Sequence, residues 1–332
     1  MPTPPSDGEQ AGPEGGATPV AYRTASDIAR QALQAQLDAL DLPVGALETT
    51  RSALPVNDAD LLRIPVGPGA VHVERYGYGG RPVVLLHGFG TSSFLWRHIG
   101  PALAVERCTA FAIDLFGHGE SDRPIDADFG VREQSEYIER ALTALRVARA
   151  VVVGVDLGAL VAMRLAADRG ERVDKLVLIS PPSLTDVPGR DIRELQRDAA
   201  RLALRMSQGL FGIVSLLRPL LEESVGDPSR MPDKLLGRYL APYLGSEGVD
   251  HLLALARAIK AEDVDEIEFS DIYHSTLLIR GDRDKWSEGA DLDRLARRLT
   301  SARAVHLEGI GRLVPEETPE VLTDLILRFA NE

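Results

Sequence analysis

The chain has 332 residues, 44% of them hydrophobic, and a formal net charge of −13. This length can bury a large core, which we expect to form one main domain with an insertion. Scattered charges with a negative balance argue against nucleic acids and anionic membranes as partners, and a single cysteine, Cys108, excludes an internal disulfide framework.

The first 60 residues are expected to lie outside the main domain. Residues 1–21 are rich in proline, glycine, serine and acidic residues, which predicts a disordered tail. Residues 22–60 are predicted to be a helical extension, because Thr24–Leu40 carries an apolar stripe at helical spacing, made of Ala29, Leu33, Leu37 and Leu40. Burial of this stripe on the same domain is favoured. Burial on a partner subunit would make a homodimer, through this helix or through the insertion.

The sequence also bears on the cellular compartment. No basic segment followed by an apolar one opens the chain, and no stretch approaches the roughly 20 apolar residues of a membrane-spanning helix. With one cysteine, we expect a cytoplasmic protein.

From residue 61 strands and helices alternate. Leu61–Val66 and Ala70–Tyr76, separated by Gly67-Pro68-Gly69, predict a strand hairpin. Further strands are predicted at Val83–Leu86, Ala110–Asp114, Ala150–Val155, Lys175–Ser180, Thr276–Arg280 and Ala304–Leu307. Helices are predicted around Ser93–Ala104, Glu133–Leu145, Ala159–Asp168, Leu292–Leu299 and Pro319–Phe329. This order predicts an α/β fold with a doubly wound, mostly parallel sheet over residues 61–182 and 271–332.

Residues 183–270 interrupt this alternation. They have no convincing strand and show helical periodicity at Ile192, Leu195, Ala199, Leu202 and Met206. The segment is too long for a loop and lies between two sheet strands, so we predict a helical cap over the carboxyl edge of the sheet. Because ligands bind at that edge, a cap there would exclude water and supply an apolar pocket wall.

The sheet is organised around one strand and the turn that follows it. Ala150–Val155 is a continuous apolar run typical of a buried parallel strand, and it leads into Gly154-x-Asp156-x-Gly158 and a helix. The glycines allow a sharp turn that presents Asp156 at the tip of the strand, beside the N–H groups of the helix. The same five residues could also form an ordinary strand-to-helix turn in which the aspartate caps the helix. The pentapeptide alone therefore leaves open whether Asp156 is functional or structural.

Four segments, in order along the chain, resemble the motifs of the α/β-hydrolase fold family. They are His87-Gly88-Phe89-Gly90, Asp114-Leu115-Phe116-Gly117-His118-Gly119-Glu120-Ser121-Asp122-Arg123-Pro124, Gly154-Val155-Asp156-Leu157-Gly158 and Gly281-Asp282-Arg283-Asp284. The resemblance runs from about residue 61 to the C-terminus, interrupted by the predicted cap, and it implies the α/β-hydrolase fold. An aspartate at the nucleophile position is similar to the haloalkane dehalogenase and epoxide hydrolase branches.

The resemblance implies roles for individual residues. Asp156 would be the nucleophile, because a carboxylate is ionised at neutral pH and can attack carbon to form an ester. The backbone N–H groups of Phe89 and Leu157 would form the oxyanion hole. Asp284 would be the catalytic acid after its strand.

Further residues are expected near the pocket. His87 would brace the oxyanion turn, and His118 lies on a loop at the edge of the site. Trp96 follows the oxyanion turn as in those branches, although core packing is the more common role of such a residue. Tyr239 and Tyr243 would donate to the alkoxide of an opened epoxide if their helix continues past the intervening proline.

Two departures from the family pattern bear on the mechanism. Arg312, in Gly309-Ile310-Gly311-Arg312, occupies the position of the family's catalytic histidine, and a guanidinium cannot accept a proton at neutral pH. A salt bridge from Arg312 to Asp156 or Asp284 would also lower the basicity of the nucleophile and block it. Leu157 stands where those branches carry tryptophan, so a halide would lose an indole donor.

An ester on the nucleophile would form once and then resist hydrolysis without a base that activates water. Among the seven histidines of the chain, the two candidates for a replacement are His118 and His251, the latter in the predicted cap.

Three hypotheses remain for the function. The first is a hydrolase that uses Asp156 as nucleophile on a small apolar epoxide, halide or ester. The second is a catalytically degenerate fold member that binds a small apolar ligand or a protein partner. The third is a lyase or cyclase in which Asp156 and Arg312 form an acid–anion-binding pair. No metal cluster, phosphate-binding loop or dinucleotide fingerprint is recognised, so no cofactor is expected.

Overall fold

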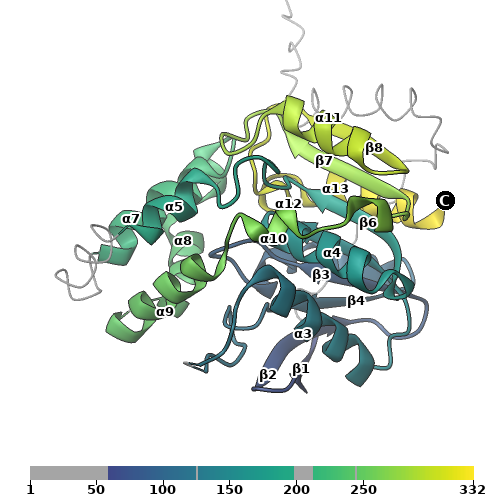
Figure 1. The fold of residues 1–332 in the computed structure, drawn as a ribbon, viewed down its shortest axis with the longest axis horizontal. Helices are drawn as coiled ribbons and strands as arrows, with labels where there is room; N and C mark the ends of the chain where they lie inside the picture. Colours follow the sequence, from purple (N-terminus) through teal and green to yellow (C-terminus); the bar gives the residue numbers. More distant parts are fainter. Residues whose placement is uncertain (1–58, 125, 198–211, 244) are drawn as a thin grey trace, which may run out of the picture.

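The computed structural model describes residues 59–124, 126–197, 212–243 and 245–332, which surround an eight-stranded sheet (Figure 1). The strand order is β1-β2-β4-β3-β5-β6-β7-β8. The antiparallel pairs are β1 with β2 and β2 with β4, and the remaining neighbours are parallel. The strands are β1 Ala59–Pro65, β2 Ala70–Tyr76, β3 Arg81–Leu86, β4 Cys108–Ile113, β5 Ala150–Val155, β6 Val173–Ile179, β7 Thr276–Gly281 and β8 Ala302–Leu307. The predicted hairpin and the mostly parallel sheet are confirmed.

The central strands are buried along their length. Every residue of β4, β5 and β7 is buried, as expected for apolar runs that are covered on both faces. The edge strand β1 alternates instead, and its Leu61 is 70% exposed. The middle of the sheet therefore lies in the hydrophobic core of the molecule.

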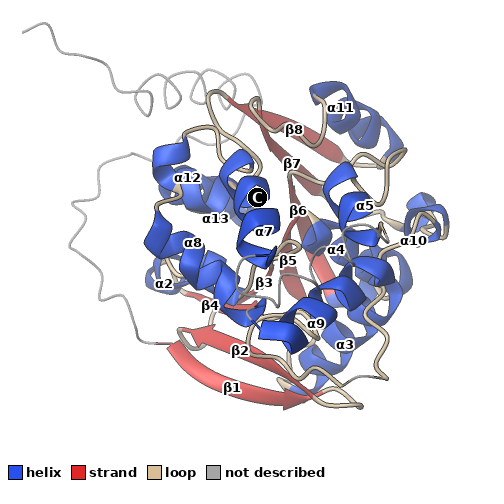
Figure 2. Ribbon diagram, turned by 90° about the vertical axis from the view of Figure 1, so that its left-hand side faces the viewer, coloured by secondary structure: helices blue, strands red, loops and turns tan. Residues whose placement is uncertain are grey.

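Helices cover both faces of the sheet. Figure 2 shows α2 (Ile99–Val105) and α13 (Pro319–Asn331) on one side of the strands. On the other side lie α3 (Val131–Ala144), α4 (Leu157–Asp168) and α11 (Gly289–Arg298). The short elements η2 (Gly170–Arg172) and α12 (Val314–Glu317) connect neighbouring elements. This is the layering that a doubly wound sheet requires.

The predicted helix Ser93–Ala104 is wrong as a single element. The chain forms a 3₁₀ turn, η1 (Ser93–Trp96), and then starts α2 at Ile99. Pro101 lies in the first turn of α2, where its missing N–H is not needed. Inside one continuous helix the same proline would remove a hydrogen bond. The chain therefore ends η1 at Trp96 and begins α2 at Ile99.

Between β6 and β7 the described residues form helices and no strand. They are α5 Arg190–Gln196, α7 Gly212–Glu223, η3 Pro228–Arg230, α8 Asp233–Leu240, η4 Ala241–Tyr243, α9 Gly245–Ala258, α10 Glu262–Asp265 and η5 Phe269–Asp271. In Figure 1, α5, α7, α8 and α9 gather beyond the end of the sheet toward which β7 points. This end is the carboxyl edge of the parallel strands, where the predicted cap belongs.

The predictions for residues 1–21 and for the helical extension up to residue 58 lie outside the described residues. So do Ala199, Leu202 and Met206 of the predicted cap periodicity. Among the residues that are described, no helix is long and apolar enough to cross a membrane.

Candidate active site

Asp156 lies at the sharp turn between β5 and α4. Its φ of +53° is in a region that L-residues with side chains rarely adopt, so the turn is strained. A Cβ on Gly154 would collide with the Gly158 carbonyl, and one on Gly158 would collide with the Leu86 carbonyl. The two glycines are therefore needed to bring β5, α4 and β3 close enough to form this turn.

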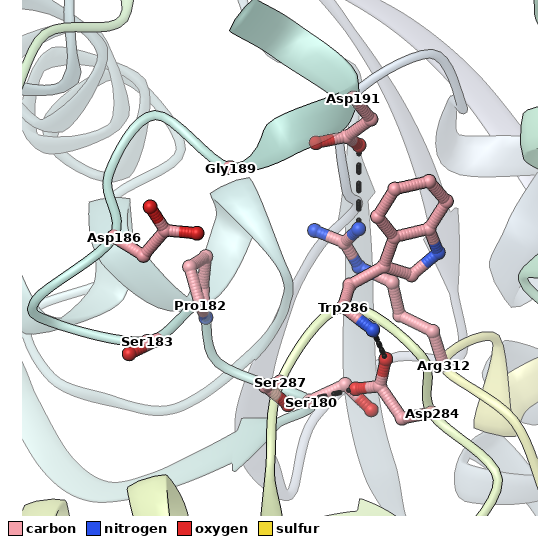
Figure 3. Close-up of a pocket in the computed structure, with 10 residues that line it drawn as sticks. All are labelled: Ser180, Pro182, Ser183, Asp186, Gly189, Asp191, Asp284, Trp286, Ser287 and Arg312. Atoms are coloured by element: carbon pink, nitrogen blue, oxygen red, sulfur yellow. Dashed lines mark hydrogen bonds and ion pairs between the residues drawn. The ribbon is translucent and has the colours of Figure 1, made fainter.

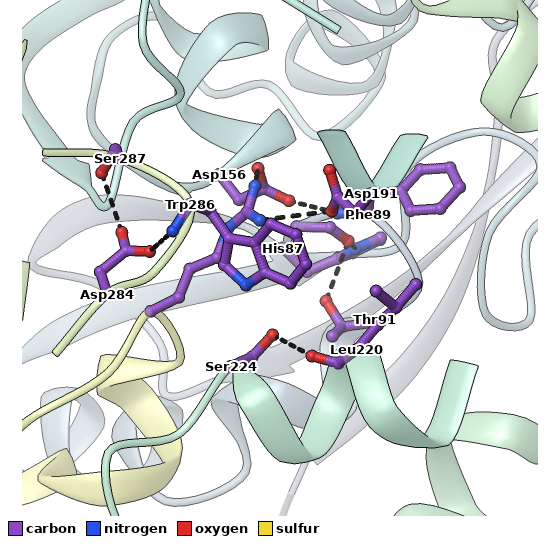
Figure 4. Close-up of polar contacts among 12 residues, drawn as sticks. His87, Phe89, Thr91, Asp156, Asp191, Leu220, Ser224, Asp284, Trp286 and Ser287 are labelled. Carbon is purple, nitrogen blue, oxygen red and sulfur yellow. Dashed lines mark hydrogen bonds and ion pairs between the residues drawn. The ribbon is translucent and has the colours of Figure 1, made fainter. Parts of the chain in front are cut away.

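The carboxylate of Asp156 is buried and both of its oxygens are bonded. Oδ2 accepts the backbone N–H of Phe89 at 3.0 Å, and Oδ1 accepts a hydrogen bond from the guanidinium of Arg312. Burial raises the pKa of Asp156 above its ordinary value, and the positive charge of Arg312 opposes this rise. Figure 4 shows Asp156 beside the loop that carries Phe89. The Asp156 carboxylate is thus bonded to the Phe89 N–H on one side and to a cation on the other.

Arg312 bridges two carboxylates. Its second terminal nitrogen lies 3.3 Å from Oδ2 of Asp191, on α5 (Figure 3). The Arg312 guanidinium also lies 5.8 Å from the centre of the Trp286 ring. Burial disfavours its charge, but the surrounding carboxylates, with that of Asp156 foremost, raise the pKa of Arg312 above its already high value. Arg312 is therefore a permanent buried cation.

Asp284, the predicted catalytic acid, forms no ion pair with Arg312. Its carboxylate accepts the N–H of Trp286 and the hydroxyl of Ser287, each at 2.9 Å. The buried Arg280 donates to the carbonyl of Asp284 at 2.8 Å and to that of Ser287, which fixes the loop after β7. Of the two salt bridges expected for Arg312, the structure contains the one with Asp156, and Asp191 supplies the second carboxylate.

The loop that carries Arg312 is tied to the connection after α7. The N–H of Leu313 donates to the carbonyl of Ser224 at 2.9 Å. The Glu317 carboxylate accepts the N–H groups of Gly311 at 2.6 Å and Gly226 at 2.8 Å. These bonds fix the backbone on both sides of Arg312.

A narrow pocket opens beside the Arg312–Asp191 pair and has room for about one water molecule. Figure 3 shows the residues that line it: Ser180, Pro182, Ser183, Asp186, Gly189, Asp191, Asp284, Trp286, Ser287 and Arg312. Ser180 is 1% exposed and has a φ of +43°, so its backbone is strained at the end of β6. The Oγ of Ser180 and Oδ1 of Asp191 have no hydrogen-bond partner among the described residues.

Comparisons with known proteins agree with this fold. The family model described as alpha/beta hydrolase fold matches residues 81–208. The structure of an α/β-hydrolase fold protein from Burkholderia ambifaria superposes with a TM-score of 0.72, at 24% identity, over 81% of this chain and 99% of that one. The chain has the α/β-hydrolase fold.

Curated relatives of this α/β-hydrolase-fold protein have several names. An uncharacterized protein of Mycobacterium tuberculosis is 31% identical over 57% of this chain and 53% of its own length. The dihydrolipoyllysine-residue acetyltransferase component of an acetoin cleaving system from Pseudomonas putida is 30% identical over 77% of this chain and 65% of that protein. A haloalkane dehalogenase of Mycobacterium marinum is 38% identical over 30% of this chain and 34% of that enzyme. The chain spans about half the length of the first curated relatives that it matches.

The other residues that the sequence placed in the oxyanion turn and pocket of this α/β-hydrolase-fold protein are buried, except Phe89, which is partly buried. The N–H of Phe89, and not that of Leu157, is the described backbone donor to the Asp156 carboxylate. His87 accepts the N–H of Leu115 at 3.0 Å, and burial lowers the pKa of His87, so it is neutral and braces two loops. Trp96 is fully buried in the core and does not line the pocket described above.

The two candidate histidines of this fold member bind backbone carbonyls. His251 contacts the carbonyl of Gly117 at 2.5 Å, and His118 contacts that of Phe116 at 3.4 Å. Burial holds the pKa of His118 well below its usual range. Within the described part of the chain, neither imidazole is hydrogen-bonded to Asp156.

The two tyrosines do not share a helix face. Because α8 ends at Leu240, Tyr239 lies in α8 and Tyr243 in the 3₁₀ turn η4, where the proline interrupts the helix. The Tyr239 hydroxyl donates to Glu316, which also forms a two-bond pair with Arg97 at 2.6 and 2.7 Å. Tyr239 therefore joins α8 to α12 and does not line the pocket beside Arg312.

Sequence reasoning missed Asp191 and Trp286. Asp191 is one acid among many in a helical segment, and no spacing rule separates it from surface acids. Trp286 follows the Gly281–Asp284 motif by two residues, and this proximity is the signal that could have found it. The described residues contain no group of three His, Cys, Asp or Glu side chains that could hold a metal ion.

Proposed function

We propose that this protein is a hydrolase that attacks a small, largely apolar epoxide, halide or ester with the carboxylate of Asp156. The observation that carries the proposal is the bond from the Phe89 N–H to Oδ2 at the strained turn. This donor holds one carboxylate oxygen in the oxyanion position and leaves Oδ1 as the attacking atom. The similarity to a haloalkane dehalogenase and the helices over the sheet edge support the same chemistry.

In the first step Oδ1 of Asp156 would bond to the substrate carbon while a halide leaves, or while an epoxide C–O bond breaks and its oxygen takes a proton from water, and either reaction gives an alkyl ester. An activated ester would lose its alcohol and leave an anhydride on Oδ1. Arg312 occupies Oδ1 in the structure, so the substrate must displace its guanidinium. Once the ester has formed, Asp156 carries no charge and Arg312 keeps Asp191 as its carboxylate partner. The first step therefore exchanges a charged pair at Asp156 for a neutral ester.

The second step is hydrolysis of that ester. We infer that Arg312 stands at the position where the family carries its histidine base, and a guanidinium cannot take a proton from water at neutral pH. Ester release is therefore expected to be the slower step, and covalent protein should accumulate during turnover.

The experiment is mass spectrometry of the intact protein, with kinetics, during incubation with styrene oxide, bromobutane and activated esters. The expected result is a mass increase located at Asp156, absent from Asp156→Ala, followed by slow product release. If no substrate is turned over and no adduct forms, with the wild type and Asp156→Ala indistinguishable, this function is excluded.

The buried Asp156–Arg312 pair favours a second candidate, a catalytically degenerate fold member that binds a small apolar ligand. In that case the pair neutralises Asp156 and keeps it from reacting. Calorimetric titration of a ligand panel separates the two functions. Ligand binding that is retained in Asp156→Ala without any adduct supports binding alone, whereas an adduct at Asp156 excludes it.

A further inference from the structure

We propose that Asp191 is the base that activates the hydrolytic water for an ester on Asp156. This inference rests on the proposed function and assigns its second step to a residue outside the family motifs. It starts from Arg312, which binds Asp156 Oδ1 through one terminal nitrogen and Asp191 Oδ2 through the other. Because the guanidinium is a rigid planar fork, both carboxylates are held close to the same reacting centre.

The second observation is the free oxygen of Asp191. Its Oδ2 faces Arg312 at 3.3 Å, whereas Oδ1 is buried and has no partner among the described residues. The hydroxyl of Ser180, also buried and unpartnered, lines the same pocket, which has room for about one water molecule. A water there can donate to Asp191 Oδ1 and exchange a hydrogen bond with Ser180, which satisfies both atoms.

The charges on Arg312, Asp156 and Asp191 favour ester hydrolysis once the ester has formed. Before reaction Arg312 is shared between two carboxylates. When Asp156 becomes a neutral ester, Arg312 keeps its bond to Asp191 Oδ2 and so fixes the direction of Asp191 Oδ1. The same arginine that cannot act as a base thereby positions a carboxylate that can.

The reaction balances with water as the only co-reactant. Asp191 Oδ1 takes a proton from water, and the water oxygen bonds to the carboxyl carbon of the Asp156 ester. The resulting oxyanion is held by the Phe89 N–H. The bond between the carboxyl carbon and Oδ1 then breaks, and Oδ1 leaves with the substrate as an alkoxide that takes the proton from Asp191. The products are an alcohol and an Asp156 that carries the water oxygen, and this acid returns to the carboxylate by losing the second water proton to solvent.

The test is single-turnover kinetics with styrene oxide and bromobutane, in which adduct formation and adduct release are measured separately by mass. Asp191→Asn is expected to form the adduct at Asp156 and to release it about 10²–10⁴-fold more slowly than the wild type. The matched control is Asp233→Asn. Asp233 lies in the first turn of α8, as Asp191 does in α5, but its side chain is 84% exposed, pairs with Arg218 and does not line this pocket, so release should be unchanged.

A second variant guards against a folding defect. Asp191→Ala should show slow release that increases with added formate, because a small carboxylate can occupy the place of the deleted side chain. Release by Asp191→Asn within about twofold of the wild type, or no response of Asp191→Ala to formate, overturns this proposal while an adduct at Asp156 still supports the proposed function. No adduct and no turnover with the wild type overturns both.

Discussion

The buried Asp156–Arg312 pair makes a quantitative prediction about stability. Both side chains are 8% exposed, and the Asp191 side chain that shares Arg312 is 12% exposed. Replacing Arg312 with methionine leaves two carboxylates without their cation, and loss of one partner of a buried pair costs about 3–5 kcal/mol. Arg312→Met should therefore lower the free energy of unfolding by this amount at pH 8, measured by urea denaturation.

The same variant has a predicted pH dependence. Burial raises the pKa of Asp156 above 3.8, its usual value, and without Arg312 only the hydrogen bond from the Phe89 N–H still opposes the rise. An acid whose pKa is higher in the folded than in the unfolded state loses stability as the pH rises through that interval. The cost of Arg312→Met should thus be smaller at pH 5 than at pH 8, and Asp156→Asn in the same chain should reduce both the cost and its pH dependence.

The surface ion pair between Arg193 and Asp186 provides the control for Arg312→Met. Arg193 pairs with Asp186 at the surface, with side chains 43% and 51% exposed, so Arg193→Met should change stability by less than about 1 kcal/mol. The charge pair does not stabilise the protein if Arg312→Met costs no more than this control, or if the costs of Asp156→Asn and Arg312→Met are additive in the double variant.

Three further predictions concern the turn, the base and the buried imidazoles. Gly154→Ala should lower the free energy of unfolding by about 1–3 kcal/mol, because the added Cβ meets the backbone of α4. Gly237→Ala, which has open space in α8, should raise it by about 0.5–1 kcal/mol, and equal midpoints of urea denaturation for the two variants would contradict this prediction. In the Asp191→Asn variant, Arg312→His should restore adduct release by up to about 10²–10⁴-fold because an imidazole then supplies a base, and unchanged single-turnover release in this double variant would refute the assigned position of the missing base. Because burial lowers the pKa of His118, the folded state binds fewer protons than the unfolded state below about pH 6.5. The melting temperature should fall as the pH drops from 7 to 5, and His118→Gln should flatten this fall.

The fold could be predicted from the sequence because the apolar patterns of its strands and helices are strong and consistent with one another. Continuous apolar runs such as Ala150–Val155 cannot be solvent-exposed strands, and their alternation with helices leaves few topologies. The single helix predicted at Ser93–Ala104 was wrong because the apolar pattern was given more weight than Pro101, a residue that favours the start of a helix.

The site was only partly predictable. The resemblance to the α/β-hydrolase fold family implied that Asp156, Phe89 and Arg312 would lie together, at the sheet edge where such folds bind ligands. The sequence could not show whether Arg312 pairs with Asp156 or with Asp284, because the position of Asp284 depends on how Arg280 fixes the loop after β7. Asp191 was missed because its contact with Arg312 joins segments 121 positions apart, and no local pattern carries such a contact.

The position of Trp286 also makes the site observable by light. The chain has two tryptophans, and Trp96 is fully buried away from the pocket, whereas the Trp286 ring lies against the guanidinium of Arg312. Trp96→Phe would leave a single indole whose emission reports on the charges around it. Displacement of the guanidinium during substrate binding would then appear directly as a change in fluorescence, without any attached dye.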